Sequence, residues 1–344
     1  MVVFALLAII TFPVTAALAA LGSLVWPPPT GWPPARPYLR SYLRALAQPR
    51  PRKWRLLRVL LVAVVYLAAE LVALSALGWL WVRSGFGRHL REPASERRHY
   101  LLVAWLLDTV YRLAESVLHV RVRIEGPSPD EYLGRPLVVF CRHAGPGDSL
   151  LIVHALLKRY DREPRIVLKD LLQLDPAIDI VLNRLPNRFV RAGRDRPVEA
   201  IADLATRLDG NDALVLFPEG GNFTARRRAR AILKLRRRGM LAQAEKAERM
   251  RHVLPPRTAG VVAALGAQRD NPDPPDVVWV AHTGTDHLFS VGDVWRALPM
   301  DVEITMRWWR VPFDEIPADP QAQGDWLYAW WRLIDDWIEQ NRPV

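Results

Sequence analysis

The sequence predicts an α/β fold, in which a mostly parallel central sheet is flanked by helices and preceded by an N-terminal membrane helical region. Beyond residue 100, short apolar segments of strand length alternate with helical stretches, a pattern typical of parallel sheets. Before residue 100 there are two long apolar runs, of the length that crosses a hydrocarbon core of about 30 Å. We therefore predict an N-terminal membrane anchor over residues 1–99 and a larger domain over residues 100–344.

The first apolar run occupies residues 3–26, and no charged side chain occurs between Met1 and Ala35. Such a run is typical of a membrane segment. A cleaved signal peptide is the alternative, but no Lys or Arg precedes the run and a second apolar run follows it. Pro13 would kink a helix here, so a half-crossing shape is a further alternative.

The second apolar run occupies residues 59–82 and has Glu70 as its single charge. Between the runs, the linker 27–55 is rich in proline and then in arginine, which favours an extended path beside an anionic leaflet. Arginines also follow the second run, so the positive-inside rule does not decide the topology. Either a hairpin that does not fully cross or a contribution from residues 100–119 would resolve the conflict. We predict a protein of the cell membrane with its larger domain on the cytoplasmic face.

Residues 100–119 carry polar side chains at every third or fourth position, which marks one face of an amphipathic helix. We expect this helix to lie in the membrane interface or against the larger domain.

The larger domain contains several short segments that are apolar or alternate strictly between apolar and polar residues. Strands are predicted at 120–125, 137–141, 165–168, 187–190, 213–217 and 277–281. Helices are predicted between them, notably at 148–160, 197–209 and 225–250. In such a sheet, ligands bind beyond the carboxyl ends of the strands.

The charge balance indicates an anionic partner. Lys and Arg number 47 against 36 Asp and Glu, for a net charge of +11. The run 225–238 contains eight cations and no acid. A solvated helical face is the usual explanation of such a run, but we assign it to anionic headgroups or substrate phosphates rather than to nucleic acid. Cys141 is the single cysteine, which excludes disulfides and cysteine-based zinc sites, and we expect it in the sheet interior.

Two side chains at the end of the predicted strand 137–141 carry the chemistry. His143 and Asp148 are separated by five positions across a glycine-proline turn. An imidazole is suited to take a proton from an alcohol near neutral pH, and a carboxylate beside it fixes the tautomer. Asp148 as a helix N-cap is an alternative that is compatible with this role. Gly145 and Gly147 let backbone amides approach a substrate carbonyl and stabilise an oxyanion.

A second marker, LVLFPEGG at 214–221, ends another buried strand in a glycine-rich turn. Glu219 is predicted to accept hydrogen bonds from substrate hydroxyls on the same edge of the sheet as His143. Taken alone, Glu219 would be read as a residue at a helix start that interacts with the helix dipole.

The two markers occur together with further motifs. These are HAGPGD at 143–148, NRFVRAGR at 187–194, FPEGGNFT at 217–224, VLPPRTAG at 253–260 and WLYAWWRLIDDWI at 326–338. In these motifs the chain resembles the 1-acylglycerol-3-phosphate acyltransferase family, the PlsC-like lysophospholipid acyltransferases, over about residues 100–340.

The resemblance implies transfer of a fatty acyl group from a thioester to the hydroxyl of a lysophospholipid, as in phospholipid biosynthesis, without a covalent intermediate. His143 would take the hydroxyl proton, Asp148 would hold the imidazole, and Glu219 with Gly220 would shape the acceptor pocket. It also implies an arginine near Phe189 that binds the acceptor phosphate. The family position for that arginine is alanine here, so Arg191 or Arg194 would substitute. Gly221 stands where the family commonly has threonine.

The resemblance also predicts the partners: membrane lipids, a lysophospholipid acceptor and an acyl-CoA donor, with acyl carrier protein as the alternative donor. No cofactor and no metal are expected. His282, Asp286 and His287 could suggest a metal, but without a convincing third ligand we assign them to a loop. The C-terminal tryptophans are assigned to packing or an interface. Two other functions stay open: a catalytically silent lipid-binding protein of the membrane surface, and a thioesterase or lipase on the same fold.

Overall fold

The structure is a computed structural model with two compact units. It describes residues 11–12, 14–19, 54–128, 131, 134–145, 147–191, 196–286 and 291–342. The described parts of 1–72, 109–120 and 290–301 form the first unit, and those of 73–108, 121–289 and 302–344 form the second. Both units therefore include residues on each side of position 99. The division into an anchor over 1–99 and a catalytic domain over 100–344 stays a prediction.

The first unit is held together by backbone and arginine contacts between segments far apart in the sequence. Arg55 donates from Nε to the carbonyl oxygen of Leu298 at 3.0 Å, and the amide of Met300 donates to the carbonyl of Leu118 at 2.9 Å. The Nδ1 atom of His119 lies 2.7 Å from the Asp301 carboxylate. The helix α11(Val291–Ala297) belongs to this unit.

The predicted apolar run at 59–82 forms one helix, α3(Arg55–Arg83). Within the part of the chain that the structure describes, it is the one helix long and apolar enough to cross a membrane by length and composition. Of its apolar window, 17% is buried, and most of the remaining residues are partly exposed. Of the earlier run at 3–26, residues 11–12 and 14–19 are helical, and the prediction that this run enters a membrane lies outside the described residues.

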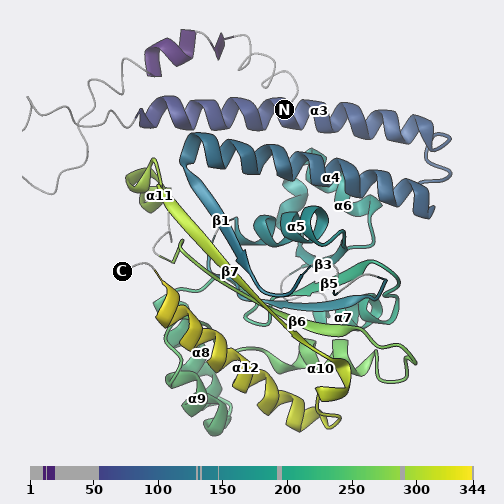
Figure 1. Cartoon of the computed structure of the whole chain (residues 1–344), viewed down its shortest axis with the longest axis vertical. Coiled ribbons are helices and arrows are strands. Elements are labelled where there is room, and N and C mark those ends of the chain that lie inside the picture. The colour runs from purple at the N-terminus through teal and green to yellow at the C-terminus, as the bar shows by residue number, and fades with distance from the viewer. Residues whose placement is uncertain are drawn as a thin grey trace, which may run out of the picture. The chain divides into compact units, whose positions relative to one another are not determined.

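The second unit is built on a seven-stranded sheet with the order β1-β7-β6-β2-β5-β3-β4 (Figure 1). Its strands are β1(Val120–Glu125), β2(Leu137–Cys141), β3(Glu163–Lys169), β4(Arg188–Val190), β5(Asp212–Leu216), β6(Asp276–Thr283) and β7(Val302–Val311). Strands β6, β2, β5, β3 and β4 are parallel to their neighbours in this series, and β7 pairs with β6 in antiparallel orientation. The prediction of a mostly parallel sheet is confirmed.

All six predicted strands form, but the sequence analysis missed β7. Its burial alternates along much of its length: Ile304, Met306 and Trp308 are buried, while the residues between them are partly exposed. This period of two is the ordinary signal of a strand with one buried face. Trp308 and Trp309 are among the C-terminal tryptophans assigned to packing or an interface, and both pack inside the domain. The tilted rings of Trp308 and Tyr160 have centroids 4.7 Å apart, and Trp309 packs against the main core.

The helices of the second unit cover both faces of the sheet. They are α4(Pro93–Leu113), whose last residues belong to the first unit, α5(Asp148–Arg159), α6(Pro176–Arg184), α7(Pro197–Thr206), α8(Ala225–Arg237), α9(Leu241–Glu248), α10(Thr258–Gly266) and α12(Pro320–Asn341). Short helical turns occur at Ala114–Leu118, Asp170–Leu174 and Phe313–Glu315. The single helix predicted at 225–250 is wrong: it breaks at Gly239, whose φ of +73° favours glycine and ends a helix.

Alternate residues of each central strand point to opposite layers. In β2, Val138 and Phe140 belong to the main core with residues of α7, α10 and α12. A second cluster joins Tyr100 of α4 to Leu157 of α5 and Val181 of α6, on the other side of the sheet in Figure 1. The predicted amphipathic segment 100–119 therefore packs, through its first part, against the domain that carries the sheet.

The parallel order brings the carboxyl ends of β2, β5 and β6 to one edge of the sheet, with β2 in the middle. His143 and Glu219 lie in the segments that follow β2 and β5, and His282 lies near the carboxyl end of β6 itself.

Candidate active site

His143 stands directly beyond β2 and is held by the FPEGG loop that follows β5. Its backbone amide donates to Glu219 Oε2 at 3.3 Å, and its carbonyl accepts from the amide of Phe223 at 2.8 Å. The ring of Phe217 packs against the imidazole with centroids 4.8 Å apart. The two sequence markers therefore meet in space, as predicted.

Asp148 is the first residue of α5, and its carboxylate faces back toward the turn. The Nδ1 atom of His143 lies 2.9 Å from Oδ2. The same oxygen accepts the amides of Ala144 at 2.8 Å and Gly145 at 3.1 Å, and Oδ1 accepts the amide of Ser149 at 2.6 Å. The N-cap of α5 is Gly147, so the alternative assignment of Asp148 as the N-cap is wrong.

The surroundings of Asp148 keep it ionised. Burial by itself raises the pKa of the Asp148 carboxyl, but the hydrogen bonds and charges of His143 and His282 outweigh burial and hold that pKa below its usual range. A carboxylate accepts hydrogen bonds, so His143 must carry its proton on Nδ1. The lone pair is then on Nε2, for which no partner occurs among the described residues. The imidazole side chain is 18% exposed and can act as a base through Nε2.

The two glycines of the turn have different environments. Gly147 has a φ of +90°, in the left-handed region that glycine adopts without strain. The amide of Gly145 donates to Asp148, so it is engaged within the site. The role of Gly145 and Gly147 toward a substrate oxyanion stays a prediction, and for Gly145 it requires that this hydrogen bond be exchanged.

Glu219 is buried, with 3% of its surface exposed. Oε2 accepts the amide of His143, and Oε1 accepts the amide of Leu254 at 3.3 Å. Burial raises the pKa of the Glu219 carboxyl to about 8, against the opposing effects of the Arg142 charge and the two backbone amides. Glu219 therefore connects its own loop to the loop of His143 and to the loop of Leu254. A direct contact of Glu219 with a substrate hydroxyl stays a prediction.

The raised pKa of Glu219 predicts a pH-dependent stability. In the folded chain the carboxyl keeps its proton up to about pH 8, whereas in the unfolded chain it loses the proton near 4.5. Between these values the folded state binds more protons, so stability falls as the pH rises and levels off above 8. Glu219→Gln cannot ionise and should lack this fall. Thermal unfolding of both proteins at several pH values measures it, and parallel curves would contradict the assignment.

Gly220 and Gly221 form a turn beneath two arginines. Gly220 has a φ of +66°, and a Cβ there would lie 2.6 Å from the guanidinium carbon of Arg257. A Cβ on Gly221 would lie 3.6 Å from Nη1 of Arg227. Both arginines are exposed, and the amide of Arg257 donates to the carbonyl of Pro218 at 2.8 Å. The absence of side chains at the turn therefore lets two cations approach the loop that holds His143.

Arg191, one of the two predicted phosphate-binding arginines, lies further along the same edge. Arg191 directly follows β4, three strands from β2, or about 14 Å at ordinary strand spacing. Its side chain is 63% exposed and its Nε lies 3.9 Å from the Asp170 carboxylate. Arg194 lies outside the described residues. Binding of the acceptor phosphate by Arg191 or Arg194 stays a prediction.

The sequence analysis missed a buried group behind the dyad. His282 was assigned to a loop, but it lies within β6 and is 2% exposed. Its Nε2 lies 3.6 Å from Asp148 Oδ2. Arg142, 1% exposed, pairs with Asp286 at 2.6 Å. A buried histidine inside an apolar strand, as in VVWVAHT, was the available signal. His287 lies outside the described residues.

Cys141 lies in β2 and is fully buried, as predicted. Burial raises the pKa of its thiol well above the ordinary value, which disfavours a thiolate nucleophile beside His143.

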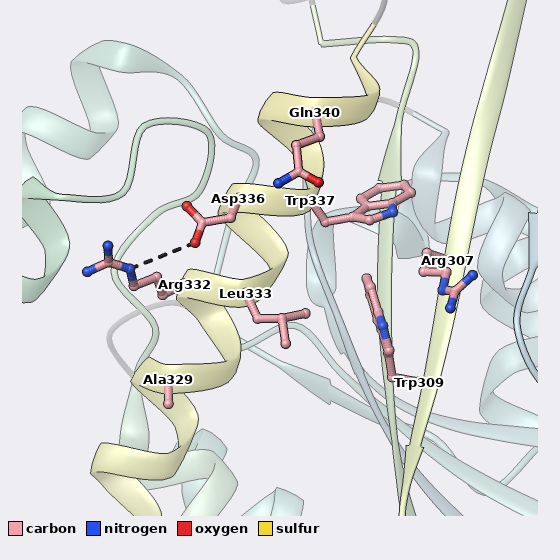
Figure 2. A pocket seen from close by; sticks show the side chains of 8 residues that line it. All are labelled: Arg307, Trp309, Ala329, Arg332, Leu333, Asp336, Trp337 and Gln340. Atoms are coloured by element: carbon pink, nitrogen blue, oxygen red, sulfur yellow. Dashed lines mark ion pairs between the residues drawn. The ribbon is translucent and has the colours of Figure 1, made fainter.

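A groove between β7 and α12 is separate from the dyad (Figure 2). It is lined by Arg307, Trp309, Ala329, Arg332, Leu333, Asp336, Trp337 and Gln340. Trp309 and Trp337 pack edge to face with centroids 5.8 Å apart.

No group of three or more His, Cys, Asp or Glu side chains placed to hold a metal occurs among the described residues.

The fold and site together define a class of enzyme. An imidazole oriented by a buried carboxylate, at the carboxyl edge of a parallel sheet and with Nε2 available, can deprotonate an alcohol for attack on an acyl group. Residues 119–262 match the family model described as Acyltransferase. A comparison with curated proteins found no match.

A solved structure has a similar fold. It is the 1-acyl-sn-glycerophosphate (LPA) acyltransferase PlsC from Thermotoga maritima, 14% identical, with a TM-score of 0.54. The alignment covers 83% of this chain and 98% of that one. Residues 119–262 are therefore similar to the Acyltransferase family, and the fold of the chain is similar to that of PlsC.

Proposed function

We propose that the protein transfers a fatty acyl group from acyl-CoA to the free hydroxyl of a lysophospholipid such as 1-acylglycerol-3-phosphate. The observation that carries the proposal is the His143–Asp148 dyad, whose 2.9 Å hydrogen bond leaves Nε2 as the base. The activity of the Thermotoga maritima PlsC, a 1-acyl-sn-glycerophosphate acyltransferase, supports the choice of acceptor.

In the proposed reaction, Nε2 of His143 takes the hydroxyl proton as the acceptor oxygen attacks the thioester carbonyl. The Asp148 carboxylate stabilises the imidazolium that forms. When the tetrahedral intermediate collapses, the carbon–sulfur bond breaks, and the imidazolium returns its proton to the departing thiolate. The products are a diacyl lipid and the free thiol of CoA, and the chain needs no metal or other cofactor for these steps.

The charge distribution supports anionic substrates. Arg227 and Arg257 lie at the Gly220–Gly221 turn, directly beside the loop bonded to His143. In α8, Arg228 and Arg236 are used internally: Arg228 donates to the carbonyl of Met250 and Arg236 pairs with Glu248. The remaining exposed cations of the run are Arg226, Arg227, Arg230, Lys234, Arg237 and Arg238. We propose that these meet anionic headgroups or carrier phosphates.

We propose that the protein works at a membrane, with its catalytic domain on the cytoplasmic face. The length and composition of α3 support membrane association. An acceptor with one long acyl chain resides in a bilayer, so a membrane-bound enzyme meets it without extracting it into water.

The test is an assay of the full chain with acyl-CoA and 1-acylglycerol-3-phosphate in detergent. Thiol release and diacyl lipid are both measured, and we expect equal amounts. Thiol release without diacyl lipid would instead indicate a thioesterase. Absence of turnover on a panel of lysolipids, with acyl-CoA and with acyl carrier protein as donors, would indicate a lipid-binding protein.

The arginine prediction is tested on the acceptor KM. Removing a guanidinium that binds phosphate should raise the KM for 1-acylglycerol-3-phosphate by about 10-fold or more, with a smaller effect on kcat. We expect this for Arg191→Ala or Arg194→Ala. Arg196→Ala is the control, because its side chain is exposed and pairs with Glu199. If all three variants keep the wild-type KM, neither predicted arginine binds the acceptor phosphate.

A further inference from the structure

A second imidazole, that of His282 in β6, lies 3.6 Å from the carboxylate oxygen to which His143 donates. In the pairing of β2 with β6, Cys141 is opposite Val280, and extension of that register by two residues places His143 opposite His282. Val277, Trp279 and Ala281 point into the main core, so His282 points to the other layer, where α5 begins with Asp148.

The environment of His282 determines its protonation at one nitrogen. Nε2 lies 3.3 Å from the carbonyl oxygen of Arg142 and 3.6 Å from Asp148 Oδ2. Both oxygens are acceptors, so Nε2 must carry a proton and donate. Asp148 thus lies between two imidazoles: His143 donates at 2.9 Å and His282 approaches the same oxygen from β6.

His282 is itself held in place. Its carbonyl accepts Nη1 of Arg142 at 2.5 Å, and the same guanidinium donates to the carbonyl of His252 at 2.9 Å. Asp286, which pairs with Arg142, accepts the amide of Gly284 at 3.0 Å. The charged and titratable groups around the ring and its Asp148 neighbour therefore include His143, Arg142, Asp286 and Glu219, which accepts the amide of His143 and interacts electrostatically with Asp148. From β7, the residue in register with His282 is Met306, which brings no charge.

We propose that His282 is a positioning residue. It holds the Asp148 carboxylate in its orientation and weakens the hydrogen bond that this carboxylate accepts from His143. This rests on the proposed function, since it assigns a further residue to the same reaction. A donor on Asp148 spreads the carboxylate charge and holds its orientation. Without it, the carboxylate would hold the His143 proton more tightly and orient the imidazole less well.

The test compares His282→Phe with His282→Gln, whose side-chain amide keeps a donor near the position of Nε2. Loss of this N–H donor, which lies 3.6 Å from the charged Asp148 carboxylate, should lower kcat of the Phe variant by about 10-fold, with the acceptor KM within about twofold. The acid limb of the kcat/KM profile should move to higher pH, because His143 becomes more basic. The Gln variant should recover most of kcat.

His154→Phe is the matched control, since it removes a His–Asp pair of the same unit, with Asp108 at 3.4 Å. It should leave kcat and the acid limb unchanged. If His282→Phe leaves kcat within twofold and the acid limb in place, or if His154→Phe moves the limb equally, the proposal is overturned.

A measurement without substrate separates this proposal from the proposed function. NMR titration of the His143 imidazole in the full chain should give a higher pKa in His282→Phe than in wild type. An unchanged titration overturns the positioning role even in an active enzyme. A shifted titration in a chain that transfers no acyl group to any lysolipid supports the coupling and refutes the proposed reaction.

Discussion

Replacing His143 by alanine is expected to lower kcat for acyl transfer by about 10²- to 10⁴-fold, the usual contribution of a positioned general base. Nε2 of this imidazole is the proposed base, and Nδ1 lies 2.9 Å from Asp148 Oδ2. The expected measurement is the rate of thiol release in the presence of 1-acylglycerol-3-phosphate. The fold should survive, because the loop contacts of His143 with Glu219 and Phe223 are made by its backbone.

The control for this variant is His89→Ala, since His89 is exposed and pairs with Glu92. It should keep the wild-type rate. A His143→Ala protein that unfolds at the wild-type temperature and still turns over at a wild-type rate would remove the imidazole from the mechanism. In that case the proposed general base would have to lie elsewhere in the chain.

Replacing Asp148 by asparagine is expected to lower kcat by about 10³-fold, because the carboxylate that orients His143 and stabilises its imidazolium is lost. Both carboxylate oxygens accept from backbone amides: Oδ2 from Ala144 and Gly145, and Oδ1 from Ser149. Whichever way the asparagine amide turns, its NH₂ group faces one of these donors. The variant should therefore also unfold at a lower temperature than wild type.

The double variant His143→Ala/Asp148→Asn separates catalysis from stability. Residues that act as one unit lose little more together than singly. We expect kcat of the double variant to match that of the slower single variant. Losses that multiply would mean that Asp148 stabilises the turn without acting through His143.

Much of the fold was predictable because its signals are local. The apolar strands 137–141 and 213–217 and the helix beginning at Asp148 follow from short patterns of burial and turn residues. The break at Gly239 needed a backbone conformation rather than a periodicity, and the long helical pattern concealed it. Strand β7 was missed for a different reason. Trp308 and Trp309 were interpreted by residue type, although the buried and partly exposed positions along this segment alternate as in a strand.

Some residues of the site were likewise predictable from local sequence, and others were not. His143 and Asp148 lie five positions apart, so a single turn is enough to bring them together, and the sequence by itself determined this pair. It also determined that the FPEGG loop belongs to the same site. The class of reaction came from the resemblance of the sequence to a known family, and a family model described as Acyltransferase matches residues 119–262.

The tertiary structure alone decided what surrounds the pair. His282 reaches Asp148 because β6 pairs with β2 in a particular register, and strand order is a long-range property that no local pattern encodes. The direction of the Glu219 carboxylate, toward the amides of His143 and Leu254, likewise depends on three loops meeting at one sheet edge. Composition and spacing specify which groups are available, and packing specifies which of them touch.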